Sequence, residues 1–210
     1  MSLTKKEKET VEAYDAQAKN WTSQHQTPGF WKKEMDKFQD LLASGKILEI
    51  GSGGGRDAKE LRKRGYLYTG TDVSEGLIRQ ARKANPNTTF IHQSVYDLYF
   101  PKDSFDGFWA SAVLLHIPKD RISEALAKIH DVVKPDGIGF ISVKEGEGEK
   151  MVSEDVQIGN MGFSRFFSFF KREEFAEILK NNGYEILEFI YHPMSEKTKW
   201  LVFFVKVKKS

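Results

Sequence analysis

Three glycines spaced two apart, Gly51, Gly53 and Gly55, follow the acidic residue Glu49 in a segment that begins with apolar side chains. Glycine has no side-chain bulk and readily adopts left-handed backbone conformations, so such a turn lets a ligand lie directly against the main chain. A helical pattern begins immediately afterwards, at Asp57. Because the first turn of a helix exposes N–H donors, this segment predicts a site for an anionic or polar ligand group where a strand meets a helix.

The spacing of the glycines argues against a dinucleotide cofactor. The nicotinamide and flavin fingerprint is G-x-G-x-x-G, and its third glycine would fall on Arg56. The chain instead carries E-x-G-x-G-x-G from Glu49 to Gly55, which resembles motif I of the class I S-adenosylmethionine-dependent methyltransferases. The resemblance implies S-adenosyl-L-methionine as the cofactor, held by Glu49, the three glycines and Ser52. The alternative is a glycine-rich surface loop, which the flanking strand and helix disfavour.

The elements around this turn alternate between strands and helices. Short apolar segments predict strands at 46–50, 66–71, 88–92, 105–110, 138–143, 184–191 and 199–207. Helical spacing predicts helices at 4–20, 30–42, 56–64, 75–84, 119–133 and 171–182, with a turn at 134–137. The pattern predicts a doubly wound α/β fold, in which helices cover both faces of a mostly parallel sheet.

The last two expected strands are joined by a short loop without a helix, so they are expected to pair as an antiparallel hairpin. A seven-stranded sheet ending in such a hairpin is the architecture of the class I methyltransferases, and the resemblance covers residues 46 to about 207. We expect one methyltransferase domain over 1–210. Within it, 1–45 form a helical lid or cap, 46–143 the cofactor-binding half, and 144–210 a substrate-loop and C-terminal half. The Gly- and Glu-rich stretch 144–164 shows no clear periodicity.

Two strand ends supply further cofactor candidates. Asp72 lies 21 residues after Gly51, where nucleotide-binding sheets carry the acidic residue that bonds ribose hydroxyls, although a turn or helix-cap role is the alternative. The resemblance places Val73 beside the adenine. Many family members have an aspartate for the adenine amino group where this chain has Ser94, a shorter and neutral acceptor. The backbone N–H of Val95 is expected at the adenine ring nitrogen.

The strand expected at 105–110 leads into a segment that resembles motif IV of small-molecule methyltransferases. Amino-methylating DNA enzymes carry Asn/Asp-Pro-Pro-aromatic there, whereas this chain reads Ala-Ser-Ala-Val from Ala110. The resemblance assigns the Ala110 backbone to the methionine ammonium group. His116 matches a histidine common in the family, and it is either a general base or a structural, polar wall of the pocket.

Three aromatic or basic residues outside the central pattern are candidates for covering the site. Tyr14-Asp15-x-x-Ala18 resembles a segment that covers the cofactor in many relatives, and Trp21 is placed near the substrate; the alternative is a helix that only docks on the sheet. Arg165 lies among phenylalanines and could bind a substrate carboxylate or phosphate. Its alternative role is an ion pair at the edge of an aromatic core.

Composition limits the remaining classes of function. The 210 residues carry a net charge of +2 and include no cysteine, which excludes disulfides, thiolate metal sites and a cysteine nucleophile. No histidine has metal-ligand spacing and no G-x-S-x-G elbow is present, so neither a metal nor serine hydrolysis is expected. No apolar stretch approaches a membrane span, and a cytoplasmic setting is expected. Nothing in the sequence specifies an oligomer.

The resemblance predicts methyl transfer to a small-molecule acceptor by direct in-line displacement, without a covalent enzyme intermediate. Alignment of the reacting groups can supply about 7–11 kcal/mol, and a general base is needed only if the acceptor holds a proton at neutral pH. The alternatives are a methyltransferase acting on RNA or protein, a non-catalytic S-adenosylmethionine-binding protein, and a dehydrogenase, which Arg56 disfavours. The modest net charge makes nucleic acid the less favoured acceptor.

Overall fold

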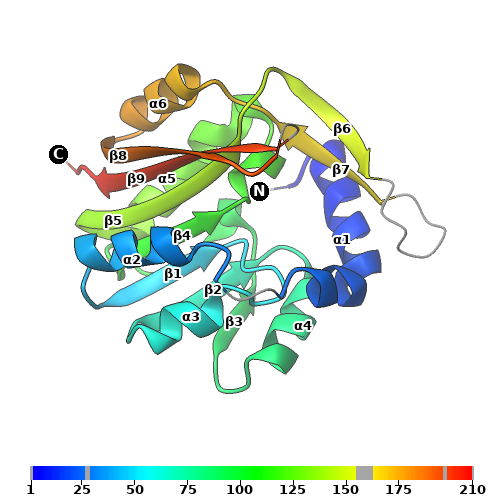
Figure 1. Ribbon diagram of the computed structural model, residues 1–210, viewed down its shortest axis with the longest axis horizontal. Helices are drawn as coiled ribbons and strands as arrows, with labels where there is room; N and C mark the ends of the chain where they lie inside the picture. The colour runs from blue at the N-terminus through cyan, green and yellow to red at the C-terminus, as the bar shows by residue number, and fades with distance from the viewer. Residues whose placement is uncertain (1, 27–28, 155–162, 196–197, 210) are drawn as a thin grey trace.

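The computed structural model describes residues 2–26, 29–154, 163–195 and 198–209 (Figure 1). Its centre is a seven-stranded sheet with the strand order β3-β2-β1-β4-β5-β9-β8. The five N-terminal strands of this sheet run parallel, and β9 pairs antiparallel with both β5 and β8. The strands are β1 Lys46–Ile50, β2 Leu67–Asp72, β3 Thr89–His92, β4 Phe105–Ser111, β5 Val133–Lys144, β8 Tyr184–Pro193 and β9 Lys199–Val207. The expected α/β fold with its C-terminal hairpin is confirmed.

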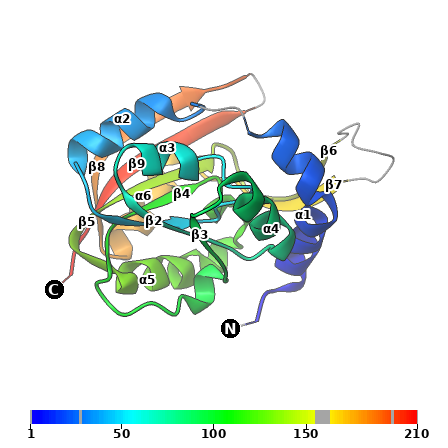
Figure 2. The same ribbon diagram turned by 90° about the horizontal axis from the view of Figure 1, so that it is seen from below.

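Helices cover both faces of the sheet (Figure 2). Neighbouring residues of β1 point to opposite faces, as in any strand. Ile47 packs with residues of α2, α3 and α4, whereas Leu48 packs with residues of α5 and α6. The helices are α1 Lys5–Gln24, α2 Lys32–Leu41, α3 Ala58–Lys63, α4 Glu75–Ala84, α5 Ile122–Val132 and α6 Arg172–Asn181, with short 3₁₀ turns η1 Val95–Asp97, η2 Leu114–His116 and η3 Lys119–Arg121.

The stretch expected to be irregular, 144–164, is partly regular. Residues Glu149–Glu154 form β6, which pairs antiparallel with β7, Phe163–Ser168, in a separate two-stranded sheet. This prediction was wrong because the pairing depends on a long-range partner: the N–H of Phe166 donates to the hydroxyl of Thr10 in α1 at 2.9 Å. Residues 155–162, part of the same expected stretch, lie outside the described residues.

The turn expected at 134–137 lies inside β5 as a bulge. Phe105 of β4 pairs with Val133, but the next paired residue, Gly107, already pairs with Ile138. The four residues between them bend away from β4, and Asp136 has a φ of 59°. The strand therefore begins earlier than its apolar pattern suggests, because pairing with β4 resumes on either side of the bulge.

The N-terminal helix α1 runs alongside the rim of the sheet, packed against α4 and β7. It begins at a capping box in which Glu7 accepts a hydrogen bond from the Thr4 N–H at 2.8 Å. The same Glu7 side chain accepts from Arg121 at 2.9 Å and from the hydroxyl of Tyr96 at 2.5 Å. Because Tyr96 belongs to η1 and Arg121 to η3, these contacts attach α1 to two loops at the carboxyl ends of the strands.

Candidate functional site

The glycine-rich turn connects β1 to α3, as its sequence predicts. Gly51, Gly53 and Gly55 have φ values of 69°, 54° and 80°. A Cβ on Gly51 would lie 2.5 Å from Val113, and one on Gly55 would lie 2.5 Å from the side chain of Asn85. Gly53 differs, because a Cβ there would meet nothing within 4 Å. The outer two glycines therefore permit close packing, while Gly53 leaves open space beside the turn.

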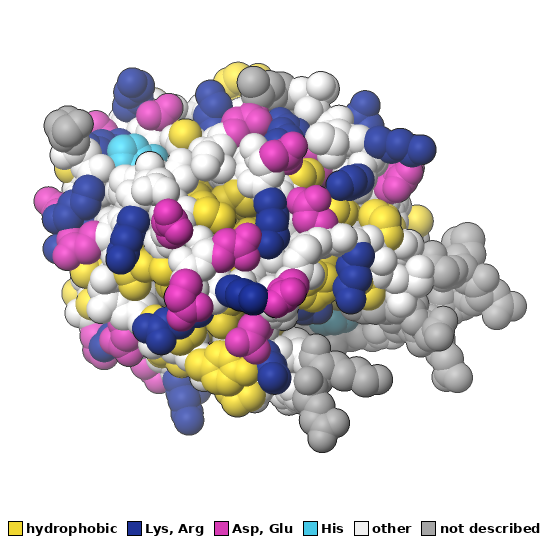
Figure 3. All heavy atoms as spheres, turned by 90° about the horizontal axis from the view of Figure 1, so that it is seen from above, with side chains coloured by type: hydrophobic (Ala, Val, Ile, Leu, Met, Phe, Trp, Pro, Cys, Tyr) yellow, Lys and Arg dark blue, Asp and Glu magenta, His cyan; other side chains and the backbone are white. Residues whose placement is uncertain are grey.

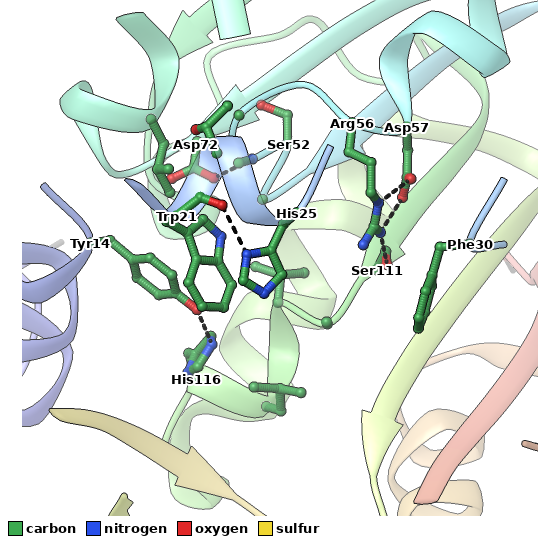
Figure 4. Close-up of a pocket in the computed structure, with 18 of the residues that line it drawn as sticks. Tyr14, Trp21, His25, Phe30, Ser52, Arg56, Asp57, Asp72, Ser111 and His116 are labelled. Atoms are coloured by element: carbon green, nitrogen blue, oxygen red, sulfur yellow. Dashed lines mark hydrogen bonds and ion pairs between the residues drawn. The ribbon is translucent and has the colours of Figure 1, made fainter. Parts of the chain in front are cut away.

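Two adjoining cavities lie at the carboxyl ends of the strands, around the point where β1 separates β2 from β4. The larger, of about 590 Å³, is lined by the glycine turn and by side chains from α1, β5, β7 and β9 (Figure 4). The smaller, of about 100 Å³, is lined by the ends of β2 and β3 and by α1. Gly51, Asp72 and His116 line both. This is the switch point at which open α/β sheets bind their ligands.

Asp72 stands where the two cavities meet. Its carboxylate is 8% exposed and accepts hydrogen bonds from the backbone N–H groups of Gly53 and Ser74, both at 2.8 Å. Burial raises the pKa of Asp72 above its ordinary value. Ser74, rather than Asp72, caps α4, since its hydroxyl accepts from the N–H of Leu77 at 3.1 Å. The helix-cap role that the sequence left open for Asp72 is therefore already filled.

The smaller cavity contains the residues expected around an adenine. Val73, Ser94 and Val95 all line it. The hydroxyl of Ser94 accepts a hydrogen bond from the N–H of Tyr96 at 3.3 Å, so it caps the 3₁₀ turn η1. The hydroxyl of Ser94 is therefore engaged within its own loop. The polar groups left for a ligand here are those of the adjacent backbone.

Two of the expected cofactor residues do not line either cavity. Ala110 is fully buried within β4, paired with Ile141, and the cavity wall begins one residue later at Ser111. The strand runs one residue beyond its expected end, so the residue at the cavity wall is Ser111 rather than Ala110. Gly55 likewise lies behind the turn, against Ala81 and Asn85 of the α4 region.

A polar cluster lies under the larger cavity. It was not predicted from the sequence, where Arg56 marked only a departure from the dinucleotide pattern. Arg56 donates to both carboxylate oxygens of Asp57, at 2.6 and 2.8 Å, and to the hydroxyl of Ser111 at 3.4 Å. The indole of Trp109 also donates to Asp57, at 3.1 Å. The adjacent residues Arg56 and Asp57, at the start of α3, were the sequence feature that could have indicated this cluster. These groups form a polar floor beside the glycine turn.

Glu49, the acidic residue of the glycine motif, is 2% exposed and accepts a hydrogen bond from the hydroxyl of Tyr68. Burial, reinforced by the nearby negative charge of Asp57, raises the pKa of Glu49 well above its ordinary value. Its carboxyl group thus belongs to the buried base of the site, although Glu49 does line the larger cavity.

His116 is held by both of its ring nitrogens. Nδ1 lies 2.7 Å from the carbonyl oxygen of Phe166, and Nε2 lies 3.0 Å from the hydroxyl of Tyr14. Because a carbonyl only accepts, Nδ1 carries the proton and Nε2 accepts from Tyr14. Burial and the positive charge of Arg165 lower the pKa of His116 to about 3. The imidazole is therefore neutral at physiological pH.

The two residues that the sequence suggested for the substrate, Arg165 and Trp21, both contact Tyr14, the hydrogen-bond partner of this histidine. Arg165 of β7 is 3% exposed and donates to the Tyr14 hydroxyl at 2.7 Å. Its guanidinium lies 4.6 Å from the ring centre of Trp21, and the Trp21 ring stacks on His25 at 3.6 Å. The fold thus brings α1, η2 and β7 together along one wall of the larger cavity (Figure 4).

The described residues contain no helix with the length and apolar character needed to cross a membrane. Within the same residues, no three or more His, Cys, Asp or Glu side chains converge in a way that could hold a metal ion.

Comparison with known protein families identifies a methyltransferase domain over residues 47–137. The chain is 32% identical over 132 residues to the ubiquinone/menaquinone biosynthesis C-methyltransferase UbiE of Rickettsia massiliae, which is 55% of this chain and 52% of that protein. It is 28% identical over 93 residues to an uncharacterized methyltransferase of Synechocystis, 44% of each chain. The chain therefore spans about half the length of the curated relatives it matches.

Solved structures share the fold. An S-adenosylmethionine-dependent methyltransferase from Methanosarcina mazei has a TM-score of 0.73 at 20% identity, covering 84% of this chain and 98% of that one. The 1,6-didemethyltoxoflavin-N1-methyltransferase of Burkholderia thailandensis, solved with 1,6-didemethyltoxoflavin and S-adenosylhomocysteine, has a TM-score of 0.74 at 21% identity over 100% and 93% of the chains. Residues 47–137 therefore form a methyltransferase domain, and the strand order together with the solved structures shows that the chain has the fold of S-adenosylmethionine-dependent methyltransferases.

Proposed function

We propose that the protein binds S-adenosyl-L-methionine across the two adjoining cavities and methylates a small-molecule acceptor. The observation that carries this proposal is the open space at Gly53, directly beside the carboxylate of Asp72, where the two cavities meet. Ser52 lines the larger cavity beside Gly53, and its hydroxyl is buried without a hydrogen-bond partner among the described residues.

Different parts of S-adenosylmethionine would occupy the two cavities. Asp72 would hold the ribose, and Val73, Ser94 and Val95 would surround the adenine in the smaller cavity. Ser52 and the polar floor at Ser111 would hold the methionine portion in the larger one. When bound, S-adenosylmethionine supplies an electrophilic methyl group on a positively charged sulfur. The protein's task is to align the acceptor with that methyl group and to exclude water.

A small-molecule acceptor fits the larger cavity. Its volume of about 590 Å³, which the methionine portion and the acceptor would share, lies within the roughly 300–1,000 Å³ typical of small-molecule sites. The Burkholderia neighbour was solved with 1,6-didemethyltoxoflavin bound, and the Rickettsia relative is named for ubiquinone and menaquinone biosynthesis. On the face shown in Figure 3, basic and acidic side chains are interspersed. A nucleic-acid footprint would instead concentrate basic side chains in one stripe.

Residues 1–45 act in this proposal as the cap over the site. Tyr14 and Trp21 of α1 line the larger cavity, and Asp15 holds the helix against α4 by accepting from the N–H of Gly76 at 2.7 Å. A cap of this kind strengthens polar interactions at the reacting centre because it removes water from it.

His116 is proposed as a positioning residue rather than a general base. Its Nε2 already accepts from Tyr14, and a pKa of about 3 leaves it with little tendency to take a proton. Its imidazole instead orients Tyr14 and, through it, Arg165.

The substitution His116→Asn tests this role. We expect kcat/KM to fall by less than about tenfold with the shape of its pH profile unchanged, because removing a general base typically costs about 10²–10⁴-fold. The measurement is the pH dependence of methyl transfer in both proteins. Loss of a titrating limb together with a 10²-fold or larger fall would make His116 the base after all.

The function itself is tested by calorimetry and a methyl-transfer screen. Titration of S-adenosylhomocysteine into the purified protein should give saturable one-to-one binding, while NADH should give none. Labelled S-adenosylmethionine and a metabolite extract should then yield a labelled small molecule. Absence of S-adenosylhomocysteine binding would refute the cofactor assignment, and binding without transfer to any acceptor would support the non-catalytic alternative.

A further inference from the structure

Aromatic rings from separate parts of the chain line the larger cavity. Trp21 comes from α1, Phe30 and Trp31 precede α2, Phe167 lies in β7 and Trp200 in β9. Several of these rings already contact each other; Trp31 and Trp200, for example, lie edge to face at 5.8 Å. Such walls favour a flat, aromatic ligand, which can stack on them or meet their edges.

Acidic and basic side chains line different parts of this cavity. The acidic side chains among its described lining residues are Glu49, Asp57 and Asp72, and all of them belong to the glycine turn and the adjacent strand ends. Asp57 is paired with Arg56, and Asp72 accepts from two backbone N–H groups. The acidic groups are therefore buried on the cofactor side.

The opposite wall carries positive charge. Lys144, the last residue of β5, places its ammonium 4.5 Å from the ring centre of Phe167 and 5.7 Å from that of Trp200. Arg165 lies on β7, in the separate two-stranded sheet, and lines the same cavity. After burial, the positive charges of Arg165 and Lys144 both contribute to the lowered pKa of His116, which lines the same cavity. An anionic group between these residues would be stabilised by charge-assisted contacts.

From this arrangement we infer that the methyl acceptor is a planar aromatic molecule bound as an anion, with its ionised group directed to Lys144. This inference rests on the proposed function and specifies the substrate class of the same cavity. It also explains how transfer proceeds with a neutral, fully hydrogen-bonded His116: the cationic wall lowers the acceptor's pKa, so the acceptor releases its proton to solvent on binding.

The chemical step then balances without a protein base. An electron pair of the anionic acceptor forms the new bond to the methyl carbon. The carbon–sulfur bond breaks, and its electron pair goes to sulfur. The anion and the sulfonium are thereby converted into a neutral methylated product and a neutral thioether. The cations of the far wall hold the acceptor until its charge is lost, which favours release of the product.

A matched set of probes tests the inference on the protein saturated with S-adenosylhomocysteine. The probes are 2-naphthoate, its neutral isostere 2-naphthamide, and the cation 2-naphthylmethylammonium, with quenching of tryptophan fluorescence as the readout. We expect 2-naphthoate to bind at least about tenfold more tightly than the amide, and the cation to bind most weakly, since hydrogen bonds to charged groups are stronger than those to neutral ones.

The variant Lys144→Met should reduce the preference for 2-naphthoate over the amide by about tenfold. Lys150→Met is the control, because the ammonium of Lys150 also lies over a phenylalanine, 5.1 Å from the ring centre of Phe169, but that lysine does not line the cavity. Equal affinity of the wild-type protein for all three probes would overturn the inference even while S-adenosylhomocysteine binds. An unchanged preference in Lys144→Met would overturn the role of Lys144. Failure to bind S-adenosylhomocysteine would instead reject the proposed function.

Discussion

Replacement of Gly53 by valine is expected to abolish detectable binding of S-adenosylhomocysteine by a protein that still folds. Gly53 has a φ of 54°, a region that costs a non-glycine residue about 1–3 kcal/mol, and more for a β-branched one. The new side chain would also project into the space that the turn leaves open toward the cavity. Strain and steric exclusion act together, so we expect the affinity measured by calorimetry to fall by about 10²-fold or more.

Gly65→Val is the matched control for this substitution. Gly65 also has a positive φ, 93°, and a Cβ there would likewise meet nothing within 4 Å. It lies between α3 and β2, at the amino ends of the strands and away from both cavities. Gly65→Val should therefore lose stability without losing affinity. Near-native affinity in a folded Gly53→Val protein would contradict the cofactor site.

Removal of the Asp72 carboxylate is expected to weaken S-adenosylhomocysteine binding by about 1–3 kcal/mol, or roughly 5- to 150-fold. Asp72→Ala removes the proposed ribose acceptor. It also leaves the N–H groups of Gly53 and Ser74 without their present partner, so the glycine turn loses the contact that orients it. The affinity of both proteins is measured by titration calorimetry, with circular dichroism to confirm that the variant folds.

Asp106→Ala provides the comparison at the other end of the sheet. Asp106 also accepts from a backbone N–H, that of Lys46 at 2.7 Å, and from the ammonium of Lys134 at 2.6 Å. Its loss should reduce stability and leave affinity unaltered. If Asp72→Ala and Asp106→Ala had the same dissociation constant as the wild-type protein, the ribose assignment of Asp72 would be wrong.

The elements whose signals lie within a few consecutive residues were predictable. The strand at 46–50 and the helix at 75–84 have the bounds expected from their apolar patterns. The glycine turn was identified by its spacing, and the mostly parallel sheet followed from the alternation of strands and helices. Local patterns determine these features because backbone preference and side-chain periodicity act over short stretches of chain.

The shape of the site depended on contacts between distant residues. The hydrogen bond between Tyr14 and His116 spans 102 positions, and that between Arg165 and Tyr14 spans 151. The hydrogen bond between Trp31 and Ser111, 80 positions apart, is a further example.

The sequence by itself therefore determined the class of fold, the glycine turn after the first strand and the methyltransferase domain that contains it. Only the tertiary structure decided that His116 has both nitrogens engaged, and that Lys144 and Arg165 line the same cavity as the glycine turn. The physical reason is that hydrogen-bond partners, burial and the resulting pKa of a group depend on the residues that packing brings around it, and no short stretch of sequence specifies those neighbours.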